Sequence, residues 1–246
     1  MRFFIELSYE GTNYHGWQVQ PNANTVQAEI NKALSLILNS KIEVTGAGRT
    51  DAGVHARQMF AHFDYDSEFD FYTINIKLNS FLPNDIAVHS FFNVNDDASS
   101  RFDALSRIYN YNIVQQKSPF KKNAYFVHKH LNIKQMNLAC QSLLGAQDFT
   151  SFSKANTQTF TNNCNVIIAS WKWQDDELIF TIKADRFLRN MVRAIVGTLL
   201  EVGIGKIKAE QVKGIIAQKN RCMAGTSVPA NALFLSKIEY PQDTFI

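Results

Sequence analysis

The stretch GAGRTDAGVHA, Gly46–Ala56, joins two segments that both have the composition of β-strands. Lys41–Ala47 (KIEVTGA) alternates apolar and polar residues, and Ala56–Tyr65 (ARQMFAHFDY) is rich in aromatic residues. The joining stretch contains three glycines, one arginine, one aspartate and one histidine. Loops that are held by strands are where catalytic and binding side chains concentrate, so this stretch is the first candidate for a functional site.

Asp51 is the candidate catalytic residue of this loop. An aspartate in a glycine-rich loop is usually only a turn residue, because Asp tolerates turn geometry. Here Gly48 and Gly53 flank it and allow close approach of a ligand, and Arg49 supplies a cation two residues away. His55 is a possible base, but a single histidine near the start of a strand is more often structural.

Strand and helix patterns alternate along the chain in two similar series. Asn24 is expected to cap the first helix, with Gln27 as its capping-box partner. The first series comprises strands at 3–9, 42–47, 56–65 and 86–92 and helices at 24–37 and 71–80. The second comprises strands at 107–114, 166–173, 178–183 and 232–239 and helices at 133–144, 187–202 and 209–217.

Two such series predict an α+β protein with two similar halves, residues 1–105 and 106–246. Each half is expected to place its helices on one face of a largely antiparallel sheet. The other face of the sheet is then free for a ligand.

Composition narrows the class of protein. Hydrophobic residues make up 46% of the 246 residues and charged residues 19%, which is enough for a sizeable core. The sequence has no apolar run of membrane-spanning length, and MRFFIELSYE at its start does not have the pattern of a signal peptide. Three scattered cysteines predict neither a metal site nor a disulfide framework, so a reduced, cytoplasmic location is expected.

Charge is distributed unevenly between the predicted halves. Residues 1–105 carry 7 Lys+Arg and 13 Asp+Glu, a balance of −6, whereas residues 106–246 carry 18 and 9, a balance of +9. A basic half favours a polyanion such as a nucleic acid as the partner, although surface charge also drifts by chance.

Two patterns in the second half are compatible with RNA binding. Tyr109 and Tyr111 share one face of a predicted strand, where they are either ordinary sheet packing or a stacking platform for a base. Arg186, Arg189 and Arg193 form a stripe on the predicted helix within 184–206. The stripe is either simply solvated or available to phosphates or a buried carboxylate.

Together the motifs resemble one family over nearly the whole chain. Gly48–Ala56 (GRTDAGVHA) resembles the signature of tRNA pseudouridine synthase A. Further matches follow in the family's order: Tyr9-Glu10-Gly11-Thr12 with Gly16-Trp17-Gln18, Ser100-Arg101-Phe102 with Arg107-Ile108-Tyr109-Asn110-Tyr111, Gly145 with Asp148-Phe149 and Phe152, and Phe187-Leu188 with Met191-Val192-Arg193.

The resemblance implies a homodimeric enzyme without cofactor or metal. It implies an activity that isomerises uridines at positions 38, 39 and 40 of the tRNA anticodon stem-loop to pseudouridine. It also implies that the two sheets join into one continuous sheet, with the RNA-binding cleft on the face opposite the helices.

The resemblance also implies roles for individual residues. Asp51 is expected to act as nucleophile, on either the ribose or the uracil ring, after the uridine has been flipped out. Arg193 would keep Asp51 charged, Arg49 would fill the vacated space in the RNA, and Tyr109 would stack on the uracil. Arg101, in a matching motif, and Arg189, in the arginine stripe, are further candidates for binding the substrate.

The chain departs from the family pattern at two places, and two other functions remain open. Thr161–Ile167 lacks the arginine that the family often has there, and Ala232 replaces a usual glycine. A non-enzymatic RNA-binding module would use only the aromatic sheet and the basic half. A glycosidase-like hydrolase would pair Asp51 with a second carboxylate.

Overall fold

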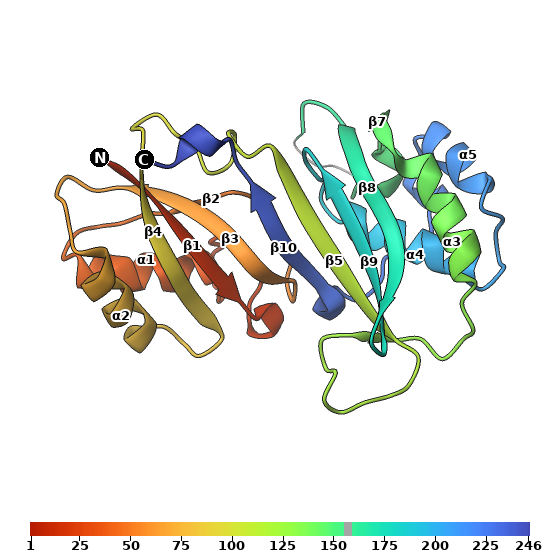
Figure 1. Cartoon of the computed structure of the whole chain (residues 1–246), viewed down its shortest axis with the longest axis horizontal. Helices are drawn as coiled ribbons and strands as arrows, with labels where there is room; N and C mark the ends of the chain where they lie inside the picture. Colours follow the sequence, from red (N-terminus) through yellow and green to blue (C-terminus); the bar gives the residue numbers. More distant parts are fainter. Residues whose placement is uncertain (155–158) are drawn as a thin grey trace. The chain divides into compact units, whose positions relative to one another are not determined.

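The computed structural model describes residues 1–154 and 159–246. The chain forms two compact units, each with helices against a largely antiparallel sheet (Figure 1). Unit 1 comprises Met1–Leu105 and Leu235–Ile246, and unit 2 comprises Ser106–Phe234. The predicted α+β class is thus confirmed. The C-terminal segment belongs to unit 1, whereas its position in the sequence had suggested the second half.

Unit 1 is built around β1, which pairs antiparallel with β3 on one side and β4 on the other. The strand order is β4-β1-β3-β10, and the two-residue β2 pairs with β3. Helices α1 and α2 contact each other, and α2 also contacts β4. The elements are β1 (Arg2–Tyr9), α1 (Val26–Ile37), β2 (Thr45–Gly46), β3 (His55–Asp64), α2 (Phe71–Phe81), β4 (Ile86–Val94) and β10 (Leu233–Glu239).

Aromatic side chains pack on both faces of this sheet. Rings from β1, β3 and β4 meet those at the start of α2 on one face, with centroids 4.8–6.5 Å apart; these are Phe3, Phe63, Phe69, Phe71 and Phe91. On the opposite face, Tyr240 and Phe245 from the C-terminal segment pack against Phe4, Phe60 and Phe92. In unit 1 the face opposite the helices is therefore partly covered, and not free as expected.

Unit 2 has the strand order β5-β9-β8-β7, with β6 parallel to β5. Helix α4 is apolar and buried on almost every side, which makes it the centre of this unit's core. The elements are β5 (Ser106–Val114), β6 (Tyr125–Phe126), α3 (Ile133–Cys140), β7 (Gly145–Asp148), β8 (Asn163–Gln174), β9 (Glu177–Ala184), α4 (Met191–Gly203) and α5 (Gln211–Ala217).

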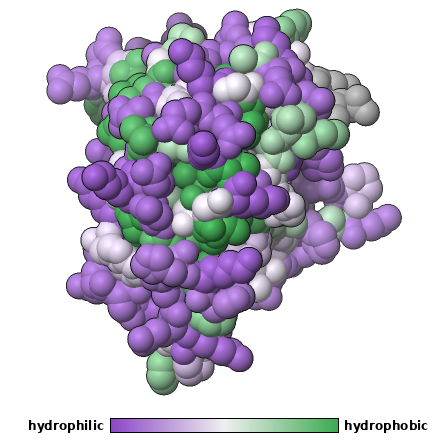
Figure 2. Space-filling model, turned by 90° about the vertical axis from the view of Figure 1, so that its right-hand side faces the viewer, coloured by the Kyte–Doolittle hydropathy of each residue, from purple (hydrophilic) through white to green (hydrophobic). Residues whose placement is uncertain are grey.

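The end of the molecule that carries α3, α5 and β7 is shown in Figure 2. Its surface is predominantly hydrophilic around a central apolar area. None of the helices within residues 1–154 and 159–246 combines the length and the apolarity that crossing a bilayer requires.

The first helix starts one residue later than a cap at Asn24 would place it. Its N-cap is Thr25, which makes no capping hydrogen bond with its side chain. Gln27 is not a capping-box partner, because its Oε1 accepts from the Val19 N–H at 2.8 Å and its Nε2 donates to the Val44 carbonyl at 2.7 Å. Gln27 thus ties the helix to the chain on either side of it, and the predicted capping box is wrong.

Candidate active site

The loop that carries Asp51 is anchored in unit 1 through the residue beside it. The Thr50 side chain is buried, and its Oγ1 lies 2.8 Å from the Tyr9 hydroxyl in a buried hydrogen bond. The Thr50 carbonyl accepts from the Trp17 N–H at 3.3 Å, and Trp17 is itself almost completely buried. The strand β1 and the segment after it therefore hold the loop at the position before the carboxylate.

Two glycines allow this geometry. Gly53 has φ of +76°, where a side chain would be strained, and its N–H donates to the Tyr14 carbonyl at 3.3 Å. Gly16 packs directly on the loop, since a Cβ at this position would lie 2.3 Å from the Thr50 carbonyl oxygen. The loop conformation thus depends on a glycine within it and on another beneath it.

His55 supports the loop from behind. The side chain is 1% exposed, and its Nδ1 accepts a hydrogen bond from the Gly11 N–H at 2.9 Å. Glu10 Oε1 lies 3.3 Å from the same nitrogen. Because a nitrogen that accepts from an N–H carries no proton, this contact with Glu10 is not an ion pair. The structural interpretation of His55 fits these contacts better than a role as a base.

The residues on either side of Thr50 are accessible. Arg49 is exposed and Asp51 is half-buried. A Cβ added to Gly48 would meet nothing within 4 Å, so the loop has open space at that position. The loop therefore presents a carboxylate and a guanidinium on a rigid support, with room for a ligand to come close.

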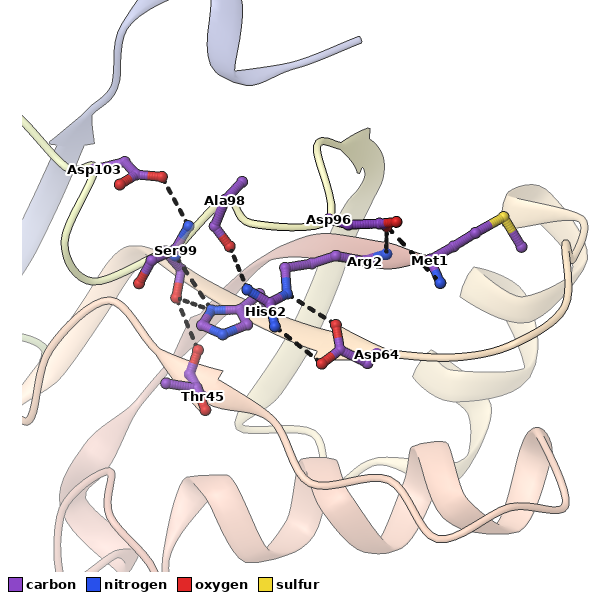
Figure 3. A network of polar contacts seen from close by, with 10 residues as sticks. Met1, Arg2, Thr45, His62, Asp64, Asp96, Ala98, Ser99 and Asp103 are labelled. Carbon is purple, nitrogen blue, oxygen red and sulfur yellow. Dashed lines mark hydrogen bonds and ion pairs between the residues drawn. The ribbon is translucent and has the colours of Figure 1, made fainter.

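A polar network holds the segment before Arg101, also in unit 1 (Figure 3). The Arg2 guanidinium donates to both carboxylate oxygens of Asp64, at 2.8 and 2.9 Å, and to the Ala98 carbonyl at 2.9 Å. The hydrogen bond from Arg2 holds the pKa of Asp64 below its usual value. The Arg2 backbone N–H also donates to Asp96 at 3.1 Å. Arg2 of β1 therefore fixes several points of the loop that follows β4.

Ser100 is the second anchor of that segment. Its hydroxyl lies 2.8 Å from His62 Nδ1 and donates to the Thr45 carbonyl at 2.8 Å. Burial and the nearby Arg2 lower the pKa of His62, which favours the neutral imidazole. Arg101 follows this anchor, is exposed, and holds its guanidinium 5.2 Å from the ring centre of Phe102.

Tyr109 and Tyr111 lie in unit 2, on the same face of β5, but in different environments. Tyr111 is fully buried and its hydroxyl donates to the Pro229 carbonyl at 2.9 Å, while burial raises its pKa above the usual range. Tyr109 is half-buried, with its ring edge-on to Phe187 at 5.1 Å. The prediction that Tyr111 belongs to a stacking platform is therefore wrong. Of these two tyrosines, only Tyr109 keeps an accessible ring.

The predicted arginine stripe does not exist as one helical face. Helix α4 begins at Met191, because Asn190 has a left-handed φ of 68° and its side chain donates to Ser227 Oγ at 2.7 Å. Arg186 and Arg189 consequently lie in the loop between β9 and α4. Arg189 is exposed there.

Arg193, the third of these arginines, lies in the first turn of α4. Its Nε donates to the Val228 carbonyl at 2.7 Å, and the Val228 N–H donates back to the Arg193 carbonyl at 3.3 Å. Val228 belongs to Ser227–Leu233, the segment in which Ala232 replaces the family's usual glycine. That segment thus retains a positioning contact with one of the predicted site residues.

Three supporting residues were not expected from the sequence: Tyr9, Asn190 and Phe187. Asn190 had a local signal, since Asn is one of the few residues that adopt a left-handed conformation. Tyr9 and Phe187 belong to motifs that match the family, but nothing local indicated their supporting roles, because each acts through a contact with a residue far away in the chain.

Comparison with known proteins identifies the family. A family model described as tRNA pseudouridine synthase matches residues 7–103 and 139–241. The chain is 52% identical to tRNA pseudouridine synthase A of Bacteroides thetaiotaomicron, over 99% of this chain and 92% of that protein. The proteins of the same name from Bacteroides fragilis and Porphyromonas gingivalis are 53% and 47% identical, over 99% and 100% of this chain and 98% and 99% of theirs.

An α+β protein with a carboxylate on an anchored, glycine-flanked loop and a basic second unit has the features of an enzyme that acts on nucleic acid. The comparisons specify the class: the chain belongs to the tRNA pseudouridine synthase family and is an isomerase.

Proposed function

We propose that this enzyme isomerises uridines at positions 38, 39 and 40 of the tRNA anticodon stem-loop, with Asp51 as the nucleophile. The observation that carries the proposal is the position of Asp51 beside the buried, hydrogen-bonded Thr50, on a loop with open space at Gly48. The half-buried Asp51 carboxylate is accessible to a ligand that reaches this loop. The proposed reaction uses neither a cofactor nor a metal.

The reaction breaks the bond between ribose C1′ and uracil N1 and forms a bond between C1′ and C5. The C5 proton is lost and N1 gains a proton, so the product is an isomer of the substrate. A stacked uridine hides these atoms, so the nucleotide is extruded before Asp51 attacks either C1′ or the uracil ring.

The other candidate residues bind the RNA. Arg49, exposed next to the carboxylate, enters the space left by the flipped nucleotide, and the half-buried ring of Tyr109 stacks on a base. Arg101, Arg189 and Arg193 supply positive charge to phosphates or to the nucleophile.

The enzyme acts as a homodimer in the cytoplasm. Light scattering coupled to gel filtration tests the dimer, and a mass equal to that of the monomer would contradict it.

Tritium release from tRNA labelled at uracil C5 tests the activity. Release with an intact RNA chain and no free uracil is the expected result. Free uracil would indicate a hydrolase, and stable binding without release would indicate an RNA-binding module. Reverse transcription after carbodiimide treatment maps pseudouridine in the product and so tests the modified positions. Pseudouridine found only at positions other than 38, 39 and 40 would contradict the proposal.

A further inference from the structure

The loop between β5 and α3 has an unusual charge pattern. The chain carries 22 acidic residues in 246, yet none lies between Asp103 and Asp148. The same interval carries six basic residues, namely Arg107, Lys117, Lys121, Lys122, Lys129 and Lys134. Five of the six fall within or directly after this loop. The charge that the loop itself carries is thus entirely positive, which favours an anionic partner.

The loop is held in place at several points of unit 2. Its β6 segment pairs with the end of β5, and the Val127 N–H donates to the Val114 carbonyl at 2.9 Å. The Gln115 amide donates to the Lys129 carbonyl at 2.9 Å. Figure 1 shows this part of the chain as a long excursion from the end of β5. These hydrogen bonds fix the backbone at both ends of the loop.

The side chain of one lysine of the loop, Lys121, takes part in this anchoring. Lys121 pairs with Asp176 and lies 3.2 Å from Glu177 Oε1, both on the β8–β9 hairpin. By contrast, Lys117, Lys122 and Lys129 are exposed. The Lys121 side chain therefore helps to fix the loop, whereas Lys129 lies at the base of the loop, where its carbonyl accepts from Gln115.

Phe120 lies between Lys117 and Lys122 in the sequence, and 94% of its surface is exposed. A large apolar ring held in water on an anchored loop gains free energy when a partner covers it. An aromatic ring among basic side chains is the combination that single-stranded nucleic acid binds, through base stacking and phosphate contacts.

We propose that this loop is a second RNA-binding surface, where Lys117, Lys122 and Lys129 contact phosphates and Phe120 stacks on an unpaired base. The proposal rests on the proposed function, because it assigns the surface to the same tRNA. Val114 lies five residues after Tyr109 in β5, about 17 Å away at the rise of an extended strand. The loop therefore contacts RNA at a distance from the base that stacks on Tyr109.

Filter binding of unmodified tRNA at several KCl concentrations tests the loop. Phe120→Ala is expected to weaken binding by about 5- to 150-fold, the range for loss of one stacked base. The double variant Lys122→Ala/Lys129→Ala is expected to lower the slope of log affinity against log salt by about 2. Tyr72→Ala and Lys77→Ala, at exposed positions of α2, are the matched controls and should bind as the unmodified protein does.

Each part of the proposal has its own contradiction. Unchanged affinity of Phe120→Ala overturns the stacking role, and an unchanged salt slope of the double variant overturns the phosphate contacts. If the loop serves a protein partner instead, both variants bind tRNA normally. Tritium release by the unmodified enzyme tests the proposed function separately from the loop. A failure of the loop proposal can therefore be distinguished from a failure of the proposed function.

Discussion

At the scale of single residues, the proposed site depends on Thr50, which links a core hydroxyl to an accessible carboxylate. Thr50→Val removes the bond to Tyr9 with little change in volume. We expect it to lower the free energy of unfolding by about 1 kcal/mol, the usual net value of such a hydrogen bond. Because Asp51 is the next residue, the single-turnover rate should also fall.

Tyr9→Phe removes the same hydrogen bond from the opposite side and is the matched control. If the bond positions the loop, both variants should lose rate to a similar extent. A normal rate in either variant, measured with its melting temperature, would show that the bond serves folding alone.

Tyr109 distinguishes stacking from packing at the same scale. Tyr109→Phe keeps the ring and should retain tRNA affinity, so that any large loss of rate would come from the hydroxyl. Tyr109→Leu removes the aromatic face and should slow single turnover while the melting temperature changes little. A normal rate in Tyr109→Leu would mean that the contact with Phe187 is ordinary core packing.

At the scale of elements, patterns along the chain predicted most strands and helices, but not how they begin. The apolar periodicity over 187–202 includes Leu188, so it starts the predicted helix too early. The left-handed conformation of Asn190 makes the helix begin at Met191. The expected strand at 42–47 shrinks to Thr45–Gly46, since Val44 bonds to Asn31 and Gln27 of α1 and not to β3. Both differences arise from contacts with distant residues, which periodicity does not contain.

The His62–Ser100 anchor predicts that stability depends on pH. The pKa of His62 is lowered in the folded protein, so the unfolded chain binds the proton more readily. The contribution of the neutral imidazole is present above the unfolded pKa of about 6.5 and is lost as the pH falls below it. Melting temperatures at pH 7.5 and 5.5 should differ less in His62→Gln than in the unmodified protein. An equal difference in both would contradict the prediction.

At the scale of the whole molecule, the observed units sharpen the charge asymmetry. Unit 1 carries 8 Lys+Arg and 15 Asp+Glu, and unit 2 carries 17 and 7. The motifs predicted Asp51, Arg49 and Tyr109 as site residues without the structure, because each lies in a short contiguous stretch of the sequence. The return of residues 235–246 to unit 1 could not be predicted, since it depends on rings such as Phe4 and Phe92 that lie far away in the sequence.

This asymmetry predicts the salt dependence of tRNA binding. If unit 2 binds phosphates, log affinity should fall linearly with log salt, and contact with six or more phosphates would cost about a thousandfold between 50 and 200 mM. Filter binding over that range measures the slope. A flat dependence would mean that the basic surface of unit 2 has another purpose.

The nucleophilic role of Asp51 is the central claim, and Asp51→Asn tests it most directly. The substitution keeps the size of the side chain and removes its charge, on a loop held by Thr50 rather than by Asp51 alone. Single-turnover tritium release should fall to background, while the circular dichroism spectrum and tRNA affinity stay near those of the unmodified protein. Substantial release by a folded Asp51→Asn enzyme would contradict the account.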